Sequence, residues 1–299
     1  MSRTSGRPVD GLLVVDKPAG PTSHDVVARV RRLAGTRRVG HAGTLDPMAT
    51  GVLLVGVGRA TRLLGHLALA DKSYAATIRL GAATTTDDVE GDVVSQASVA
   101  DVSEEQVRGA LAGFVGALSQ VPSSVSAVKV DGQRAHARVR AGEEVQLAPR
   151  DVVVHELRVE AVRPSGELLE ADVWLRCSTG TYVRAIARDL GRQLGVGGHL
   201  GALRRTSVGP VATDEAVGLA ELERVNPLPV VPMNAVASRF FPTATVDEDA
   251  ARAVGFGRAL ALDLAAEEPT AVLGPDGTFL ALYRRGPVPG EARAMAVFV

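Results

Sequence analysis

Residues 40–51 place one carboxylate, Asp46, in a loop rich in glycine, small residues and proline. Pro47 keeps the preceding aspartate out of the helical region, and the glycines allow another backbone to come close. The apolar run 52–57 follows at once and reads as a strand. A loop fixed against a sheet can present a reactive side chain rigidly, which makes Asp46 a candidate catalytic group. Most Asp-Pro turns near glycine do no chemistry, so this loop alone does not decide the question.

Four further motifs accompany this loop. The pair Lys17-Pro18 precedes it, and an Asp-Lys-Ser-Tyr motif ends at Tyr74. Residues 177–184 read Cys-Ser-Thr-Gly-Thr-Tyr-Val-Arg, and residues 201–205 read Gly-Ala-Leu-Arg-Arg. Together, and in this order, the five segments resemble the motifs of the TruB family of tRNA pseudouridine-55 synthases. The resemblance extends from about residue 11 to residue 205, and a tail of suitable length follows.

The resemblance implies three catalytic residues. Asp46 corresponds to the essential aspartate of the family, and Arg184 is implied to pair with it. A guanidinium beside a carboxylate favours the ionised form in a site emptied of water. Tyr74 is implied to stack on the uracil and to move the proton on carbon 5. Whether Asp46 attacks the sugar, attacks the base or removes a ribose proton stays open.

Four more residues are implied to bind the substrate. Tyr182 and Leu203 would wall the base pocket, although both would equally suit a hydrophobic core. His41 is implied to hold the flipped RNA near the catalytic aspartate. Lys17 is implied either to support the catalytic loop or to meet a phosphate, and the sequence does not choose between these roles.

The implied reaction breaks and re-forms a bond between base and ribose, without redox change or added water. We therefore expect no cofactor and no metal, and His24, His41 and His66 lack metal-ligand spacing. The single cysteine, Cys177, excludes an internal disulfide and predicts a buried thiol in its apolar strand. No apolar run reaches membrane-spanning length, and residues 1–10 lack the apolar core of a signal peptide. These features predict a cytoplasmic protein.

The net charge of −1 argues against a uniformly basic nucleic-acid-binding surface. The charge is unevenly distributed, however. Residues 1–72 hold 11 Lys/Arg against 5 Asp/Glu, and residues 161–210 hold 7 against 4. Residues 211–299 hold 7 against 12, so the tail is acidic. Both basic stretches carry motifs, which indicates local attraction of RNA.

The periodicity predicts a mixed α+β domain. We expect strands near residues 12–15, 52–57, 74–80, 152–162 and 168–176, and a closing segment at 200–208. We expect helices at 24–33 capped by Ser23, at 60–69, at 103–111 with a Ser103/Gln106 capping box, and at 181–194. Prolines at 227, 229 and 232 mark a linker, and short strands and turns follow residue 240.

The resemblance implies the pseudouridine synthase fold, with a mixed, mainly antiparallel sheet flanked by helices. It also implies a small β-rich, PUA-like C-terminal domain. We expect a disordered tail at residues 1–9, a catalytic domain at 10–235 and the PUA-like RNA-binding domain at 236–299.

Residues 121–142 depart from compact patterning and look like an excursion that clamps RNA. Positions where the family often carries aromatic residues hold Val125, His136 and Arg138, and stacking by the last two would substitute. The excursion supplies five candidate RNA-binding residues: Lys129, Arg134, His136, Arg138 and Arg140.

Three functions fit these features. The leading one is a stand-alone enzyme that flips a uridine out of the T-arm of tRNA, with no obligate protein partner and acting as a monomer. The second is an RNA-folding factor whose catalysis is incidental. The third is a relative that works only with guide RNA and partner proteins, which the bacterial-type motifs and short tail disfavour.

Overall fold

The computed structural model describes residues 10–123, 129–130, 133–134, 147–264 and 268–299. The tail expected at residues 1–9 lies outside this range, as do three of the candidate RNA-binding residues, His136, Arg138 and Arg140. Within the described part of the chain, no helix is long and apolar enough to cross a membrane.

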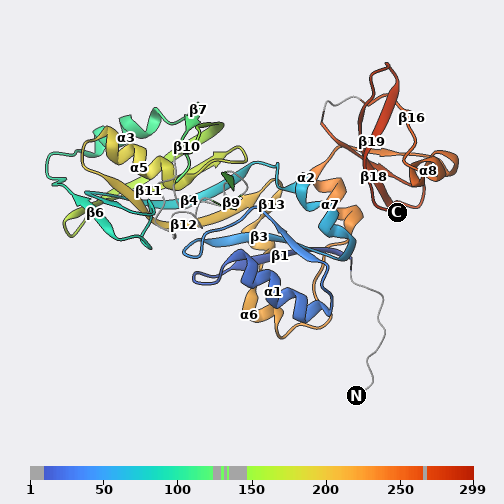
Figure 1. Cartoon of the computed structure of the whole chain (residues 1–299), viewed down its shortest axis with the longest axis horizontal. Coiled ribbons are helices and arrows are strands. Elements are labelled where there is room, and N and C mark those ends of the chain that lie inside the picture. Colours follow the sequence, from blue (N-terminus) through green and yellow to red (C-terminus); the bar gives the residue numbers. More distant parts are fainter. Residues whose placement is uncertain (1–9, 124–128, 131–132, 135–146, 265–267) are drawn as a thin grey trace.

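A ten-stranded sheet forms the larger part of the molecule (Figure 1). Its main path runs β14-β1-β3-β12-β4-β11-β10-β7, while β2 pairs with β3 and β13 with β12. The β1–β14 and β12–β3 pairs are parallel and the others antiparallel, which confirms the expected mixed, mainly antiparallel sheet. The strands are β1 Gly11–Lys17, β2 Val39–Ala42, β3 Thr50–Val57, β4 Lys72–Leu80, β7 Gly116–Gln120, β10 Arg150–Ser165, β11 Leu168–Cys177, β12 Gly198–Val208, β13 Val211–Ala212 and β14 Val217–Gly218.

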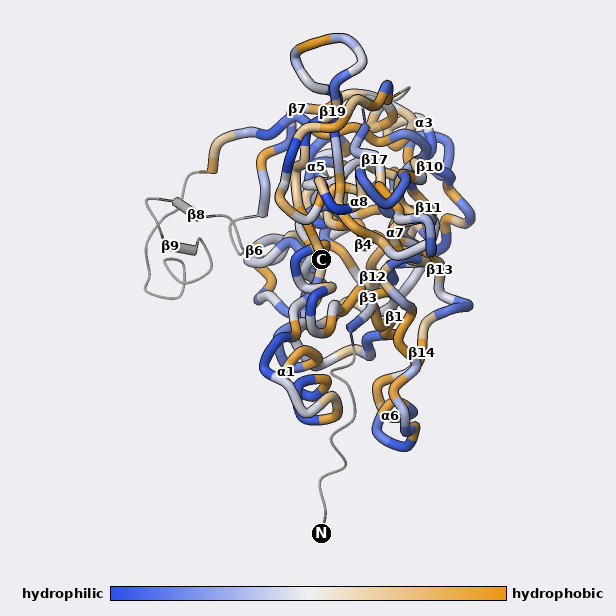
Figure 2. The backbone as a smooth tube through the Cα atoms, turned by 90° about the vertical axis from the view of Figure 1, so that its right-hand side faces the viewer, coloured by the Kyte–Doolittle hydropathy of each residue, from blue (hydrophilic) through white to orange (hydrophobic). Residues whose placement is uncertain are grey.

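Successive side chains along each strand point to opposite faces of the sheet, so each strand contributes to both faces. Leu13 and Val15 of β1 enter the largest hydrophobic core, while Leu12 and Val14 enter a second core on the opposite face. Helices α1, α3, α5 and α6 contribute to the first core, and Figure 2 shows the apolar strands at the centre of the molecule. These helices span Ser23–Ala34, Glu104–Ala112, Val183–Gln193 and Leu219–Leu222.

The predicted cap of the first helix was wrong by one residue. Thr22 is the N-cap of α1 and forms a capping box with Asp25. Ser23 is buried instead, because its hydroxyl bonds to the backbone of Leu45 in the catalytic loop. The capping box of α3, formed by Ser103 and Gln106, is as predicted.

The second core joins the ten-stranded sheet to a five-stranded C-terminal sheet. Helices α2 (Leu64–Leu67) and α7 (Met233–Phe240) lie at this junction (Figure 1). The 3₁₀ helix η1 (Gly58–Arg62) precedes α2. The smaller sheet has the order β15-β17-β18-β19-β16 and packs against α8. Its elements are β15 Thr243–Thr245, α8 Glu248–Gly255, β16 Leu260–Ala261, β17 Thr270–Leu273, β18 Phe279–Arg285 and β19 Glu291–Val297.

Three helical predictions differ from the structure. The single helix expected at 60–69 is split into η1 and α2, which are separated by Leu63. Helix α7 follows the prolines taken as a linker. Helix α8 was missed because it is short, although Asp247 followed by Glu248 and Asp249 is an N-terminal signal, and the Asp247 side chain accepts a bond from the Ala250 amide.

Two short hairpins lie in the sequence between strands of the larger sheet. Strands β5 (Ala82–Thr84) and β6 (Val93–Gln96) are antiparallel and enclose an acidic turn that contains Asp87, Asp88 and Glu90. Strands β8 (Lys129–Val130) and β9 (Gln133–Arg134) pair within the predicted RNA-clamping excursion, with Lys129 opposite Arg134.

Candidate functional site

A pocket of about 250 Å³ opens at the centre of the larger sheet. Its walls come from the loop between β2 and β3, the start of β4, the β11–α5 connection and β12. This volume is near the lower end of ligand pockets, which start at roughly 300 Å³, and therefore suits a single small ring system. The lining residues are Gly43, Thr44, Leu45, Asp46, Lys72, Tyr74, Ser178, Thr179, Gly180, Thr181, Tyr182, Val183, Arg184, Leu203 and Arg205.

The loop carrying Asp46 is pinned on both sides of the carboxylate. On one side, the Ser23 hydroxyl accepts a bond from the Leu45 amide at 2.9 Å and donates to the Leu45 carbonyl at 3.1 Å. On the other side, the Lys17 ammonium donates to the Pro47 carbonyl at 3.1 Å. Buried hydrogen bonds of this kind fix the backbone, so Asp46 is presented by a rigid loop, as its sequence predicts.

Gly51 permits the close approach that the loop's glycines predict. Its φ is +97°, and a Cβ atom there would lie 2.2 Å from the carbonyl oxygen of Arg205. The Arg205 side chain is fully buried, and it donates from Nε to the Val52 carbonyl at 2.6 Å and from Nη2 to the Gly43 carbonyl at 3.0 Å. The parallel β3–β12 contact therefore fixes both ends of the catalytic loop.

Asp46 and Arg184 form an ion pair, as the resemblance implies. Nε of Arg184 lies 3.0 Å from Oδ2 of Asp46, and Nη2 lies 3.2 Å from Oδ1. Arg184 is 4% exposed, so it is not a surface helix residue. Its Nη1 atom donates to the Thr86 carbonyl at 2.9 Å and lies 3.4 Å from Oδ2 of buried Asp88. One guanidinium thus bridges two carboxylates, of which only Asp46 lines the pocket.

The pKa of Asp46 is not simply lowered by its arginine partner, as the expected ion pair alone would suggest. Burial raises the pKa of Asp46, and this effect exceeds the lowering caused by Arg184. Asp88 raises the pKa further, while Lys17 lowers it. The guanidinium does favour the ionised carboxylate, but it only partly offsets desolvation. The result is a carboxylate that is a stronger base than an exposed aspartate.

The pocket brings together Tyr74, Tyr182 and Leu203 with the ion pair. Tyr74 is 7% exposed, and burial raises the pKa of its hydroxyl although Arg205 opposes that rise. The hydroxyl therefore carries its proton at neutral pH. The side chain of Gln120 holds the backbone of Tyr182 in both directions, accepting from its amide at 2.7 Å and donating to its carbonyl at 3.0 Å.

Lys17 and His41 were predicted to bind the substrate, but neither lines the pocket. Lys17 is fully buried beneath the loop and donates to the Pro18 and Pro47 carbonyls. His41 lies on β2, with its ring edge-on to that of His24 at 5.3 Å. The backbones of Lys129 and Arg134 lie in the β8–β9 hairpin.

Four residues at the site were not predicted as site residues: Ser23, Lys72, Asp88 and Arg205. Lys72 and Arg205 belong to motifs quoted from the sequence. Nothing in the local sequence, however, marked Lys72, Arg205 or Asp88 as buried residues of the site. Lys72 donates to the carbonyls of Ala68 and Ala70, and burial lowers its pKa to about 8. Within the described residues, no cluster of His, Cys, Asp and Glu could hold a metal ion.

Family models match the chain in three consecutive stretches. A model described as TruB family pseudouridylate synthase (N terminal domain) matches residues 31–183. A tRNA pseudouridylate synthase B C-terminal domain matches 184–227, and a tRNA pseudouridine synthase II C-terminal model matches 241–299.

Curated relatives match over nearly the whole chain. A protein named tRNA pseudouridine synthase B from Arthrobacter sp. (strain FB24) is 52% identical over 97% of both chains. Proteins of the same name from Cutibacterium acnes and Thermobifida fusca are each 53% identical, over 97% of this chain and 98% of theirs.

Solved structures share the fold. The crystal structure of a Cbf5-Nop10-Gar1 complex contains a chain that is 25% identical, with a TM-score of 0.73 over 97% of this chain and 85% of that one. The structure of an H/ACA RNP bound to a substrate RNA containing 2'-deoxyuridine has a chain with 24% identity and a TM-score of 0.71, at the same coverage.

Proposed function

Because this chain belongs to the TruB family of pseudouridylate synthases, we propose that it converts uridine 55 in the T-loop of tRNA to pseudouridine. The observation that carries the proposal is the Asp46–Arg184 ion pair at a pocket of single-ring size. Relatives of about half identity over nearly the full chain bear the name tRNA pseudouridine synthase B, which supports the choice of tRNA as substrate.

The reaction is an isomerisation whose atoms balance without a co-reactant. The bond from N1 of uracil to C1' of ribose breaks, the base rotates, and a bond from C5 to C1' forms. C5 then loses a proton, and N1 gains one. The protein must therefore supply an ionised group beside the ribose or base, a surface that holds the free uracil, and a path for one proton.

Asp46 fits the first requirement, because it lines the pocket and is held by Arg184. Its raised pKa makes it a better base or nucleophile than an exposed carboxylate. Attack on the sugar, attack on the base and removal of a ribose proton all use this one group. Arg184 keeps the carboxylate oriented and partly offsets the desolvation that opposes its charge.

Tyr74 fits the second requirement, since its ring lines the pocket close to Asp46. We expect it to stack on the uracil, with Tyr182 and Leu203 as the remaining walls. Because the Tyr74 hydroxyl is protonated at neutral pH, it must give up its own proton when it takes the proton from C5. Lys17 supports the catalytic loop from below, since its ammonium is buried on backbone carbonyls and not available to a phosphate.

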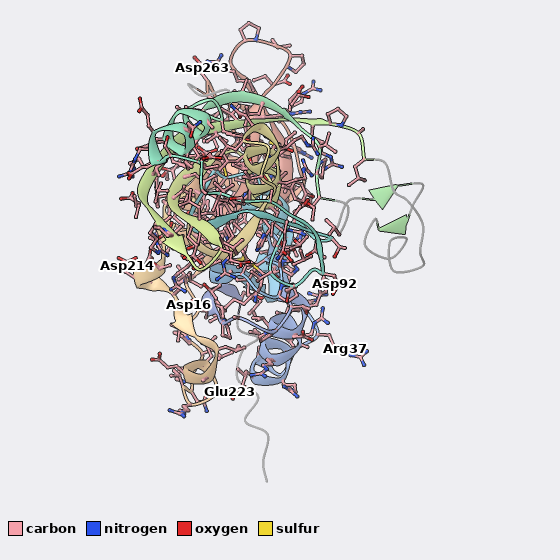
Figure 3. All side chains as sticks on the ribbon, turned by 90° about the vertical axis from the view of Figure 1, so that its left-hand side faces the viewer. Asp16, Arg37, Asp92, Asp214, Glu223 and Asp263 are labelled. Atoms are coloured by element: carbon pink, nitrogen blue, oxygen red, sulfur yellow. The ribbon has the colours of Figure 1, made fainter. Side chains whose placement is uncertain are left out.

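The RNA must reach the pocket with its uridine flipped out of the T-loop. Exposed arginines at the exit of α1, including Arg32, Arg37 and Arg38, offer phosphate contacts, and Figure 3 shows Arg37 projecting outward there. We expect His41, Lys129, Arg134 and the PUA-like C-terminal sheet to contact the T-arm as well. We infer that the protein acts in the cytoplasm as a monomer without an obligate partner.

A charge-removing variant tests the catalytic assignment. Asp46→Asn keeps the shape of the side chain and leaves Arg184 paired with Asp88. We expect turnover to fall at least about 1,000-fold, roughly 4 kcal/mol in barrier, with tRNA affinity nearly unchanged. The readout is tritium released from C5 of uridine in unmodified tRNA, with exposed Asp101→Asn as the matched control.

Two outcomes would count against the proposal. Turnover by Asp46→Asn within about tenfold of wild type, a barrier change near 1.4 kcal/mol, would remove the aspartate from the chemistry. Wild-type protein that binds tRNA but releases no tritium would favour the RNA-folding alternative.

A further inference from the structure

Two consecutive aspartates in the β5–β6 turn both reach helix α5. Asp88 pairs with Arg184, while Asp87 pairs with Arg188, whose Nη1 lies 3.3 Å from Oδ2 of Asp87. Arg184 and Arg188 are four residues apart, so they share one face of the helix. Each arginine therefore faces its own carboxylate, and the two pairs lie side by side along α5.

The turn adopts a conformation that ordinary residues avoid. Asp87 has a φ of +60°, and it is the sole non-glycine with positive φ among the residues that the structure describes. Such a conformation costs of order 1 kcal/mol and persists only where neighbouring contacts hold it. The Asp87 carboxylate accepts a bond from the Ser123 hydroxyl at 2.6 Å, and its carbonyl accepts the Leu200 amide at 2.9 Å. Side-chain and backbone contacts thus maintain the strained turn.

Arg188 joins three segments of the chain. Its side chain is 18% exposed, and its Nε and Nη2 atoms donate to the Asp189 carboxylate at 2.9 and 3.0 Å. Nη2 also donates to the carbonyl of Val121 at 2.9 Å. One guanidinium therefore ties α5 to the Asp87 turn and to residues 121–123, at the end of β7.

The same turn sets the position of the catalytic guanidinium. Residues flanking Asp87 supply two acceptors that Arg184 uses besides Asp46, namely the Thr86 carbonyl and the Asp88 carboxylate. A shift of the turn would displace these acceptors together. Because Arg184 contacts Asp46 through its remaining nitrogens, the displacement would reach the reacting carboxylate.

We propose that Asp87 and Arg188 are positioning residues for the isomerisation, holding the strained turn that aims Arg184 at Asp46. This inference rests on the proposed function. Neither residue lines the pocket, so the pair acts through Arg184 rather than on the substrate. The catalytic groups must be held within a fraction of an ångström of their productive positions. This requirement explains why a partly buried ion pair secures a turn outside the pocket.

The test compares variants at saturating tRNA under single-turnover conditions. Arg188→Ala removes the contacts to Asp87 and Val121, whereas Arg188→Lys keeps the charge alone. Asp87→Gly removes the carboxylate without straining the backbone, because glycine accepts positive φ. Arg192→Ala is the matched control on the same helix, since its side chain is 75% exposed.

We expect Arg188→Ala and Asp87→Gly to slow the rate constant at least about tenfold, about 1.4 kcal/mol, with tRNA affinity within about threefold. Arg188→Lys should recover part of the loss, and Arg192→Ala should match wild type. If Arg188→Ala does not fold, Asp87→Gly decides the question, because it relieves strain.

The pH profile separates positioning from a merely structural role. The ionisable groups around Asp46 are Arg184, Asp88, Lys17, Glu90 and Tyr74. If Arg184 moves away, Asp46 loses its main cationic support, and the acid limb of the rate profile should move to higher pH.

Three results would overturn the inference. These are wild-type rates in both Arg188→Ala and Asp87→Gly, a loss confined to tRNA affinity, or an unshifted acid limb despite a slower rate. If wild type releases no tritium at all, the proposed function fails together with this inference. If wild type and Arg192→Ala turn over normally, and Arg188→Ala and Asp87→Gly both do too, only the positioning role fails.

Discussion

At the scale of single residues, the ionisation of Asp46 is set by two opposing effects. Desolvation raises the pKa of its carboxyl, while Arg184 and Lys17 lower it without overcoming the rise. A partly buried carboxylate held by one bidentate arginine is reactive because it is both oriented and incompletely stabilised. The same arrangement makes activity sensitive to acid.

The raised pKa predicts where activity is lost on acidification. Because the reaction needs ionised Asp46, the acid limb of the single-turnover rate at saturating tRNA should have its midpoint above 3.8, the ordinary aspartate value. The rate should be measured from mildly acidic to neutral pH, with tRNA affinity determined at each pH to ensure saturation. A midpoint at or below 3.8 would show that Arg184 outweighs burial.

The lowered pKa of Lys72 predicts how the stability of the protein depends on alkaline pH. Burial lowers the pKa of its ammonium from 10.5 to about 8. Between these values the unfolded chain holds a proton that the native state has lost, so stability rises with pH. The free energy of unfolding of the wild type, measured relative to that of Lys72→Met, should therefore rise between pH 8 and 10.5. The slope should be at most about 1.4 kcal/mol per pH unit.

Urea unfolding of both proteins at several pH values measures this difference. Cys177 and Tyr74, whose pKa values are raised, are present in both proteins, so their opposing alkaline effects largely cancel. A difference that stays constant with pH would mean that the ammonium remains charged in the folded protein.

Sequence motifs identified the three residues implied to be catalytic but missed the residues that hold them in place. Asp46, Tyr74 and Arg184 lie in recognisable segments, and the structure brings all three to one pocket. Asp88 and Ser23 act through partners 96 and 22 positions away, respectively. Local composition cannot specify contacts between distant segments, because these depend on how the sheet and α5 pack.

At the scale of elements, the parallel contact between β3 and β12 tolerates an added side chain poorly. Gly51 lies at this contact with φ at +97°, and a Cβ atom would collide with backbone rather than with a flexible side chain. Either the strand pairing or the catalytic loop must shift when a side chain is added. The glycine therefore links strand pairing directly to the placement of Asp46.

We expect Gly51→Ala to destabilise the protein by several kcal/mol, since strain and overpacking each cost about 1–3 kcal/mol. Turnover of the folded fraction should also fall, because the loop is displaced. Gly109→Ala in α3 is the control: apart from its chain neighbours and the backbone of its own helix, a Cβ atom added there would meet nothing within 4 Å, and alanine favours helix. Equal stability of Gly51→Ala and wild type by urea unfolding would contradict this account.

Long elements could be predicted from periodicity, whereas short ones could not. The strands β4, β10 and β11 and the helix α5 show sustained alternation or helical spacing, and they lie close to their predicted positions. Helices α2 and α8 have too few residues to display a period, and their formation depends on packing against the second and third cores.

At the scale of the whole molecule, the C-terminal sheet shares a hydrophobic core with the larger sheet. Leu12 and Leu54 from the larger sheet cluster with Phe279, Leu282 and Phe298 of the C-terminal part. Periodicity could not predict this shared core, because alternation in β1 and β3 identifies two apolar faces but not the partner of each. Deleting the tail would expose the second core, so truncation is a poor test of what the tail does.

Phe298 offers a direct test of the shared core. Its ring is 2% exposed and lies 4.7 Å from that of Phe279, and the Arg62 guanidinium lies 5.4 Å from its centroid. Phe298→Ala should cost about 3–5 kcal/mol. Trp174, the single tryptophan, lies on β11 of the larger sheet and reports unfolding there.

If the two sheets unfold as one unit, Phe298→Ala should lower the urea midpoint of Trp174 fluorescence, although the two residues belong to different sheets. Phe256→Ala is the matched control, because Phe256 is 79% exposed in the same C-terminal part and should leave the midpoint unchanged. The contrary result is a Trp174 midpoint that Phe298→Ala leaves unchanged, together with a circular dichroism transition at lower urea concentration. It would mean that the C-terminal sheet unfolds independently. The second core would then be a docking interface between separately stable units, and the rigidity of β1 and β3 beneath the catalytic loop would not depend on the tail.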